Sequence, residues 1–329
     1  MSEWLPLVFV FLMALSMLIY VVLDGYDLGV GILVRRATDA QKDQMISSIG
    51  PFWDANETWL VLGVGILLVA FPKAHGVILG GLYLPVAAML GGLILRGVAF
   101  DFRVKAHDDH RLWWNRAFYF GSLLTTVSQG FMLGIYLLGF EYSLGNIAFA
   151  LGIGLSLVAG YSLLGATWLI LKTEGELLTR AVSWARGSLW LTGVGIIAVS
   201  VATPLVSSRI FDKWFALPNL FLLAPIPLLT AGIFLLCHRT LARMTRAEPH
   251  RAWLPFASAV ALFLLSFIGL AYSLFPYLVV DQITYLEAAT ATESLQFMGV
   301  GIAITLPAIL GYTAYSYRVF WGKTRALSY

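Results

Sequence analysis

Long apolar stretches alternate with short polar stretches along the whole chain. A helix needs about 20 predominantly apolar residues to cross the hydrocarbon core of a bilayer. Nine segments meet this requirement, and the connections between them leave no room for an extended soluble domain. We therefore predict an all-α polytopic membrane protein, a single integral membrane domain over residues 1–329. Its predicted spans are 5–31, 51–71, 76–99, 118–139, 146–171, 187–206, 218–237, 253–276 and 297–320.

The composition supports this class. The chain is 59% hydrophobic and 12% charged, with a mean hydropathy of +0.83, whereas about 25% of the residues of a soluble domain are charged. The single cysteine, Cys237, excludes a disulfide framework and a cysteine-based metal site. Nucleic-acid binding has no support, because the basic residues lie in short loops between apolar spans. The N-terminal stretch lacks the positive region and cleavage site of a signal peptide, so we expect it to be the first span.

The basic residues predict the orientation, because cytoplasmic loops of membrane proteins are enriched in Lys and Arg. Most of the 21 follow the first, third, fifth, seventh and ninth spans: Arg35, Arg36, Lys42, Arg103, Lys105, Arg111, Arg116, Lys172, Arg180, Arg186, Arg239, Arg243, Arg246, Arg251, Arg318, Lys323 and Arg325. The opposite side has only Lys73, Arg209 and Lys213, and Arg96 lies near the inner end of the third span. We expect the N-terminus outside and the C-terminus in the cytoplasm.

Two pairs of acids lie at the cytoplasmic ends of the first two spans. Asp24 and Asp27 end the first span, and Asp54 and Glu57 begin the second. Each pair has i,i+3 spacing, which places both members on one helix face. A charge at mid-bilayer costs roughly 2.5–3.5 kcal/mol, so such groups normally face a protein interior or a wet cavity. Four converging carboxyl groups would suit a proton relay; the alternative is that they cap helices at the membrane surface.

The stretch "LRGVAFDFR" adds Arg96, Asp101 and Arg103 on the same side, as candidate structural charge pairs. Arg96 either meets an acid of the first two spans or extends its guanidinium to the interface. Asp27 is the acid that we most expect at the interface, because Gly29 and Gly31 loosen the helix after it.

The histidines lie in loops or at span ends: His75, His107, His110, His238 and His250. Membrane haem proteins usually bind the haem through buried His or Met side chains, and a lone Met within a span is more often a packing residue. We therefore expect that this chain alone binds neither haem nor another metal.

Five motifs together resemble subunit II of the cytochrome bd ubiquinol oxidases. They are "LDGYDLGVGIL", "PFWDANETWL", "LRGVAFDFR", "LGATWLILKTEGEL" and "LGYTAYSYRVFWGK", in this order from about residue 20 to 323. The short length and the tail motif are most similar to the cyanide-insensitive branch. The resemblance implies two four-helix bundles plus one peripheral helix, the first bundle over about 1–140 and the remainder over about 141–329.

The resemblance also implies partners and cofactors. Subunit II pairs with a subunit I that holds the quinol site, two b-type haems and a d-type haem, and small single-span accessory subunits occur in the family. The complex lies in the bacterial inner membrane, reduces oxygen to water with cytoplasmic protons, and so generates proton motive force. Subunit II binds no haem, and in some members it holds a structural quinone.

Individual residues match family positions. Asp54 matches an aspartate proposed to lead protons from the cytoplasm toward the haems, with Asp24 and Asp27 at motif positions of less clear role. Trp59 matches a tryptophan near a proposed oxygen route, and the motif also contains Trp53 and Asn56. Glu57 stands where some members have glutamine, which weakens its claim to a role in proton uptake.

Two other functions remain open from the residues alone. A proton-coupled secondary transporter would also contain intramembrane acids, although transporters place them near the midplane on broken helices. The chain would alternatively be a passive scaffold subunit of the oxidase, with protons and oxygen entering only through subunit I.

Overall fold

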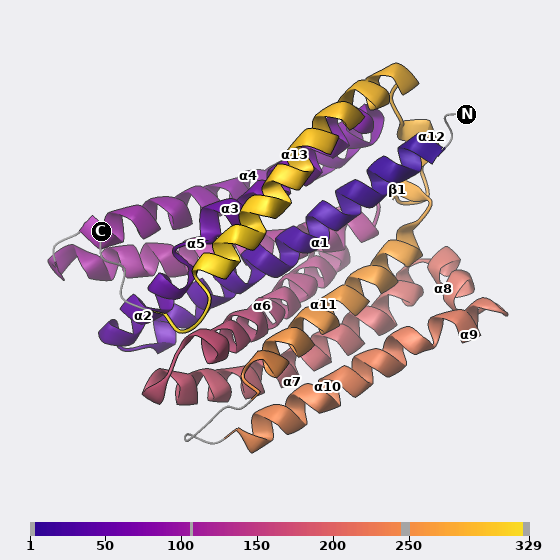
Figure 1. Ribbon diagram of the computed structural model, residues 1–329. Coiled ribbons are helices and arrows are strands. Elements are labelled where there is room, and N and C mark those ends of the chain that lie inside the picture. Colours follow the sequence, from indigo (N-terminus) through magenta and orange to yellow (C-terminus); the bar gives the residue numbers. More distant parts are fainter. Residues whose placement is uncertain (1–3, 106–107, 245–250, 325–329) are drawn as a thin grey trace.

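The computed structural model describes residues 4–105, 108–244 and 251–324. Within them, nine helices are long and apolar enough to cross a membrane, as the sequence predicts. They lie side by side with their axes roughly aligned (Figure 1). The long helices are α1 (Trp4–Leu33), α3 (Trp53–Ala70), α4 (Pro72–Lys105), α5 (Asp108–Leu137), α6 (Leu144–Lys172), α7 (Gly175–Val206), α10 (Pro225–Arg243), α11 (Trp253–Leu274) and α13 (Thr292–Val319).

Short elements complete the chain. A 3₁₀ turn η1 (Val34–Arg36) and helix α2 (Asp39–Ile49) connect α1 to α3, and Thr38 with Gln41 forms a capping box at the start of α2. The helices α8 (Ser208–Phe215) and α9 (Asn219–Leu223) precede α10. An antiparallel pair of strands, β1 (Tyr277–Val279) and β2 (Ile283–Thr284), and helix α12 (Tyr285–Ala288) follow α11.

The long helices pack as two rings of four. In the first ring α1 contacts α3 and α5, and α4 contacts both α3 and α5; in the second, α6 contacts α7 and α11, and α10 contacts both α7 and α11. The rings join where α6 packs against α1 and α5. Helix α13 lies outside both rings, over α1 and α3 (Figure 1).

Close contact between the rings depends on glycine. A Cβ atom at Gly29 of α1 would lie 1.8 Å from the carbonyl oxygen of Tyr161 in α6, and one at Gly134 of α5 would lie 2.5 Å from the Cα of Ala150. Both backbones therefore approach at distances that only glycine allows. The expectation that Gly29 loosens the helix after Asp27 is wrong, because α1 continues through it to Leu33 and this glycine packs against α6.

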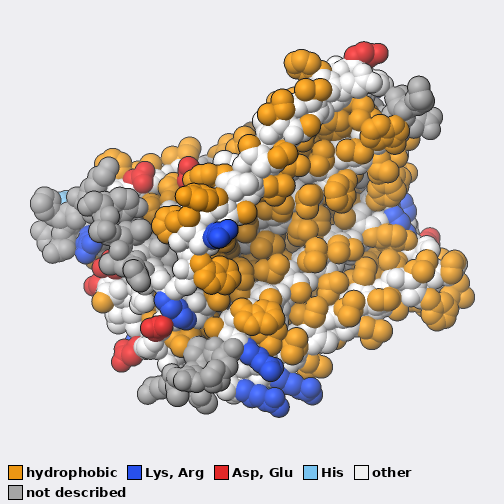
Figure 2. Space-filling model, in the orientation of Figure 1, with side chains coloured by type: hydrophobic (Ala, Val, Ile, Leu, Met, Phe, Trp, Pro, Cys, Tyr) orange, Lys and Arg blue, Asp and Glu red, His pale blue; other side chains and the backbone are white. Residues whose placement is uncertain are grey.

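The surface matches a membrane environment. Figure 2 shows hydrophobic side chains over the long middle of the helices, while charged side chains gather toward the two ends. Of the basic residues that predict the orientation, Arg246 and Arg325 lie outside the described residues. The orientation of the termini therefore stays a prediction from the basic residues.

Candidate functional site

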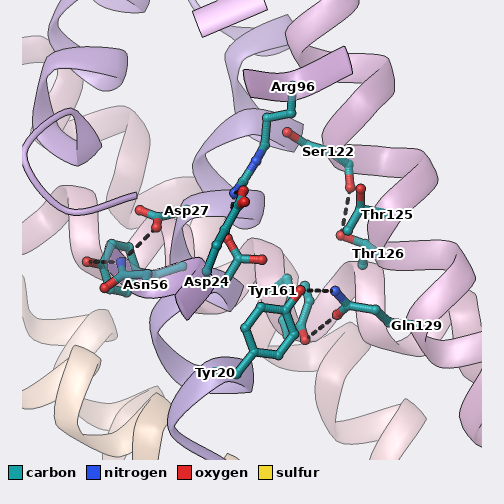
Figure 3. Close-up of polar contacts among 12 residues, drawn as sticks. Tyr20, Asp24, Asp27, Asn56, Arg96, Ser122, Thr125, Thr126, Gln129 and Tyr161 are labelled. Carbon is teal, nitrogen blue, oxygen red and sulfur yellow. Dashed lines mark hydrogen bonds and ion pairs between the residues drawn. The ribbon is translucent and has the colours of Figure 1, made fainter. Parts of the chain in front are cut away.

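A buried charge cluster lies where α1, α3 and α4 meet. It consists of Asp24 and Asp27 of α1, Glu57 of α3 and Arg96 of α4. Figure 3 shows the two aspartates and Arg96. The two aspartates are 0% exposed and Arg96 is 1% exposed. Because the two aspartates are three residues apart, both lie on the side of α1 that faces the other helices. The same spacing is visible in the sequence, so the sequence could predict that they lie on one face.

Arg96 joins two of the three acids. Its Nη2 lies 2.7 Å from Asp24 Oδ1 and is also within ion-pair distance of Glu57 Oε1. The guanidinium carbon lies 5.9 Å from the centre of the Trp53 ring. Arg96 therefore meets the acids of the first two spans, and the alternative that it extends to the interface is wrong.

The pairing of Asp24 with Arg96 is one of charge rather than of aligned hydrogen bonds. Neither carboxylate oxygen of Asp24 has a hydrogen-bond partner among the described residues, and the same holds for Nε and Nη1 of Arg96. Buried polar atoms normally have a partner. Asp24 therefore has acceptor capacity that the described part of the protein leaves unused.

Asp27 is held by a neutral amide. Asn56 donates through Nδ2 to Asp27 Oδ2 at 2.8 Å and lies 2.9 Å from the hydroxyl of Tyr26. That hydroxyl lies 2.5 Å from the hydroxyl of Tyr317 on α13. Asp27 is thus fully buried rather than interfacial, and Asn56 connects it to the peripheral helix.

The predicted convergence of four acids holds for three of them. The Glu57 side chain is 26% exposed, so it connects the buried cluster with the surface. Asp54, one turn earlier on α3, is exposed and lies outside the buried cluster. It stands in the first turn of α3, where the exposed backbone N–H groups of a helix favour an anion.

Of the other two predicted charge-pair residues, Arg103 forms an ion pair and Asp101 forms none with a described side chain. Arg103 donates to Asp43 Oδ1 of α2 and to Asn115 Oδ1 of α5, each at 2.5 Å. Asp101 is exposed, and no ion pair joins it to a described side chain. Five and two residues separate Asp101 from Arg96 and Arg103, and neither spacing places two side chains on one helix face.

The two tryptophans of the motif lie differently. Trp53 is partly buried and stands 5.1 Å from the Phe100 ring, measured between centroids. Trp59 is 1% exposed, and its indole N–H has no hydrogen-bond partner among the described residues. Trp59 is therefore an interior residue of the first ring.

Three candidate functional residues were not predicted from the sequence: Tyr20, Gln129 and Tyr161. Gln129 of α5 bridges the hydroxyl groups of Tyr20 and Tyr161, next to the charge cluster (Figure 3). Tyr20 precedes Asp24 by four residues, a spacing that could have placed it on the same face. Gln129 is a polar residue within an apolar span, and this was the signal for its role.

The described residues contain no group of three or more His, Cys, Asp or Glu side chains that could hold a metal ion. His75, His110 and His238 lie on the separate helices α4, α5 and α10, and His107 and His250 lie outside the described residues.

Comparison with known proteins gives matches over nearly the whole chain. Residues 5–320 match the family model of the cytochrome bd terminal oxidase subunit II. The chain is 28% identical to the cytochrome bd ubiquinol oxidase subunit 2 of Bacillus subtilis, covering 91% of this chain and 90% of that one. It is also 28% identical to the cytochrome bd-I ubiquinol oxidase subunit 2 of Escherichia coli K12, covering 92% and 91%.

A solved structure agrees on the fold. The bd oxidase from Geobacillus thermodenitrificans contains a chain that superposes with a TM-score of 0.77 at 18% identity, covering 96% of this chain and 98% of that one. At this identity the match supports the helix arrangement and not the role of any residue.

Proposed function

Because the chain belongs to the cytochrome bd terminal oxidase subunit II family, we propose that its buried acidic cluster delivers protons to the oxidase's subunit I. The chain is a multi-pass membrane protein and a subunit of a ubiquinol oxidase complex. Subunit I is the implied partner. The observation that carries the proposal is an excess of acids over cations within the charge cluster: the buried Asp24 and Asp27 and the partly exposed Glu57 accompany the single guanidinium of Arg96.

This excess makes the cluster a place where protons are taken up. An uncompensated buried charge costs several kcal/mol even after relaxation of the protein. Binding a proton removes that cost for one carboxylate. Asp27 has an amide partner and no cation within ion-pair distance among the described residues, so we expect it to hold the exchangeable proton.

The exposure of the acidic side chains suggests the order in which a proton passes them. Asp54 is exposed, Glu57 is partly exposed, and the two aspartates of α1 are sealed. A proton would enter at Asp54, pass to a carboxylate oxygen of Glu57, and reach Asp24 and then Asp27. The basic loops near these residues support a cytoplasmic entrance. This order includes Glu57 in the path, although the glutamine that some family members have at this position weakened the expectation of a role in proton uptake.

Electron transfer and oxygen reduction lie outside this chain. The haems that the resemblance places in subunit I would supply that chemistry when bound there. The residues of this chain hold and move protons at carboxyl oxygens and keep the cluster away from lipid. Cytoplasmic proton uptake for water formation would generate proton motive force without a pump.

Replacement of Asp54 by Asn tests the path. The amide keeps the shape and removes the proton carrier, so the quinol oxidase turnover of the purified complex should fall by about ten-fold, or about 1.4 kcal/mol in activation free energy. Haem content should stay normal. The matched control is Asp39→Asn, an exposed aspartate paired with Lys42 on the same side. Unchanged turnover in Asp54→Asn would instead favour a passive scaffold.

An apolar cavity supports a second assignment, to a quinone or lipid. It has a volume of about 380 Å³ and is lined by Met13 and Met17 of α1, Val64 and Leu67 of α3, Tyr136 of α5 and further apolar residues up to Tyr285. Its size is in the range of small-molecule sites. Its lining contains no charged side chain. We propose that it holds the prenyl or acyl chain of a quinone or lipid.

The same cavity bears on oxygen. It reaches Gly63 of α3, and Trp59 lies one helical turn further in on the same buried face. Oxygen is apolar and would dissolve in such a space, so we propose Trp59 as its inner wall.

Filling the cavity tests both assignments. Val64→Trp should lower the quinone or lipid that solvent extraction and mass spectrometry recover from the purified complex, because the larger side chain occupies the space. Val61→Trp is the control, since Val61 is exposed on the same helix and outside the lining. Equal recovery from both variants would contradict the occupant, and an unchanged KM for oxygen in Val64→Trp would place the oxygen route elsewhere.

A further inference from the structure

A chain of three neutral polar side chains continues from the charge cluster toward the N-terminal end of α1. Gln129 donates through Nε2 to the hydroxyl of Tyr20 at 2.6 Å, and the hydroxyl of Tyr161 donates to Gln129 Oε1 at 2.7 Å. Tyr20 is 2% exposed and Tyr161 is 0% exposed. Figure 3 shows both rings converging on the amide of Gln129. Three helices thus contribute one polar side chain each to the membrane interior.

This tyrosine–glutamine chain (Tyr20, Gln129 and Tyr161) lies directly beside Asp24. Tyr20 is one helical turn before Asp24 on α1, so the two side chains share a face. The ring of Tyr161 packs on the backbone of the residue after Asp24, since a Cβ atom at Gly25 would lie 2.8 Å from Tyr161 Cε1. The chain therefore adjoins Asp24, the acid of the proposed proton path that lies furthest along α1 from its end at Leu33.

Counting donors and acceptors gives the chain a direction. A phenol has one proton to donate, and Tyr161 uses its proton on Gln129. Tyr20 accepts from Gln129, which leaves its own proton available. Asp24 lies one turn later on the same face and its two oxygens have no hydrogen-bond partner among the described residues, so we assign this proton to its carboxylate. The hydrogen bonds therefore point from Tyr161 through Gln129 and Tyr20 toward Asp24.

Gln129 also limits proton transfer along the tyrosine–glutamine chain. Proton transfer in proteins uses side chains that gain and lose protons readily, such as His, Glu, Asp, Lys, Tyr and Cys. A side-chain amide donates and accepts hydrogen bonds without doing so. A proton that reaches Tyr20 thus finds an amide rather than a relay group as its next partner.

The apolar cavity lies close to the tyrosine–glutamine chain, on the side away from Asp24. The apolar cavity reaches Met17, three residues before Tyr20 on the same face of α1. Only about one helical turn, roughly 5 Å, separates the lining of this cavity from the tyrosine–glutamine chain. A path that conducted protons past Tyr20 would carry them away from the proposed entrance at Asp54, toward the other side of the membrane, and dissipate the gradient.

We propose that Gln129 ends the proton path: it holds Tyr20 and Tyr161 beside Asp24 by hydrogen bonds and passes no proton beyond them. The proposal rests on the proposed function, because it needs protons to reach Asp24. Gln129 is a positioning residue. The titratable and charged groups facing Asp24 are Arg96 of α4, Glu57 of α3, Asp27 and Tyr20 of α1, and Tyr161 of α6.

Passive proton flux tests the barrier without enzyme turnover. The complex of this chain with its partner is reconstituted in liposomes that contain a pH-sensitive dye, potassium and valinomycin, and an external pH step is applied in the absence of quinol. Gln129→Glu replaces the amide by a titratable group of nearly the same shape. We expect its proton flux to exceed that of the unaltered complex by about ten-fold or more, since carboxyl chains relay protons in membrane proteins.

Three further variants make the result specific. Gln129→Leu removes the hydrogen bonds without adding a proton carrier and should remain as tight as the unaltered complex. Ser128→Glu places a carboxyl at the neighbouring buried position of α5, away from the tyrosines, and should also remain tight. The double variant Asp24→Asn with Gln129→Glu should lose the leak, because the path to Gln129 then lacks its carboxyl. Gln129→His serves as a second titratable variant if Gln129→Glu fails to co-purify with the partner.

The outcomes separate the two proposals. The inference is overturned if assembled Gln129→Glu and Gln129→His complexes are as tight as the unaltered one, or if Ser128→Glu leaks equally. The proposed function fails if Asp24→Asn leaves turnover unchanged in uncoupled liposomes. Slow turnover in Asp24→Asn together with a tight Gln129→Glu complex overturns the barrier alone.

Discussion

Arg96 is the residue on which the charge cluster depends. It is the one cation that the described residues place within ion-pair distance of Asp24 and Glu57. Its guanidinium reaches both acids through one nitrogen, and its central carbon lies over the ring of Trp53. Removing a partner from a buried ion pair typically costs 3–5 kcal/mol, because the remaining charge stays uncompensated.

Replacing Arg96 should therefore act on stability as well as on turnover. We expect Arg96→Leu to lose about 3–5 kcal/mol and to prevent recovery of an intact complex. Arg96→Lys should assemble with a lower melting temperature, since an ammonium is a point charge without the planar fork of arginine. Arg318→Leu is the control, because Arg318 is exposed on α13. An Arg96→Leu complex that assembles and melts like the unaltered one would contradict this account of the cluster.

The sequence predicted the acids of the cluster better than their partners. Asp24, Asp27 and Glu57 were found because helical spacing and the location of span ends can be read directly from the chain. The hydrogen-bond partners of Asn56 and Gln129 could not be read, because these bonds join residues 29 to 109 positions apart. Such contacts depend on which helices are neighbours, and one sequence does not contain that information.

At the scale of helices, the contact between α1 and α6 holds the two rings together and supports the site. Gly29 of α1 faces the carbonyl of Tyr161 on α6, and Tyr161 belongs to the tyrosine–glutamine chain. Asp27 precedes Gly29 by two residues. Any change in the distance between these helices therefore moves the groups that surround Asp24 and Asp27.

A methyl group at Gly29 tests this contact. Gly29→Ala forces a backbone shift, because the Cβ would lie 1.8 Å from a carbonyl oxygen. Overpacking of this kind typically costs about 1–3 kcal/mol. We expect a lower melting temperature of the complex and slower turnover. Gly76→Ala is the matched control, since open space surrounds that position in α4. Equal melting temperatures for the two variants would show that the close approach does not matter to stability.

The spans were predictable, and their ends and connections were less so. Apolar length identifies each crossing, but α4, α5 and α7 continue beyond their apolar parts into charged residues at their ends. The two-stranded hairpin and α8 were not predicted. They are stabilised by contacts between distant segments, such as the ion pair of Arg209 with Asp281 and the 2.8 Å bond from Trp214 Nε1 to Ser273 Oγ.

For the whole molecule, the two rings and the peripheral α13 agree with the arrangement expected from the family resemblance. Helix α13 makes few contacts within the chain, and most of its large hydrophobic residues are exposed. The hydroxyl contact of Tyr317 with Tyr26 ties it to the charge cluster. The segment after α13 is also held next to the end of α6, where Lys323 donates to the carbonyl oxygen of Thr173 at 2.8 Å.

The orientation of the molecule decides the direction of the proposed proton path. The charge cluster lies toward the end of α1 at which α2 and the end of α13 also lie (Figure 1). Basic residues predict that this end faces the cytoplasm, since Lys and Arg are retained on that side during insertion. A reporter active only in the cytoplasm should therefore be active when fused after Tyr329. A reporter active only outside should be active when inserted between α8 and α9. The opposite pair of results would place Asp54 on the outer face, so that proton entry there would consume no cytoplasmic protons, and the proposed direction of uptake would be wrong.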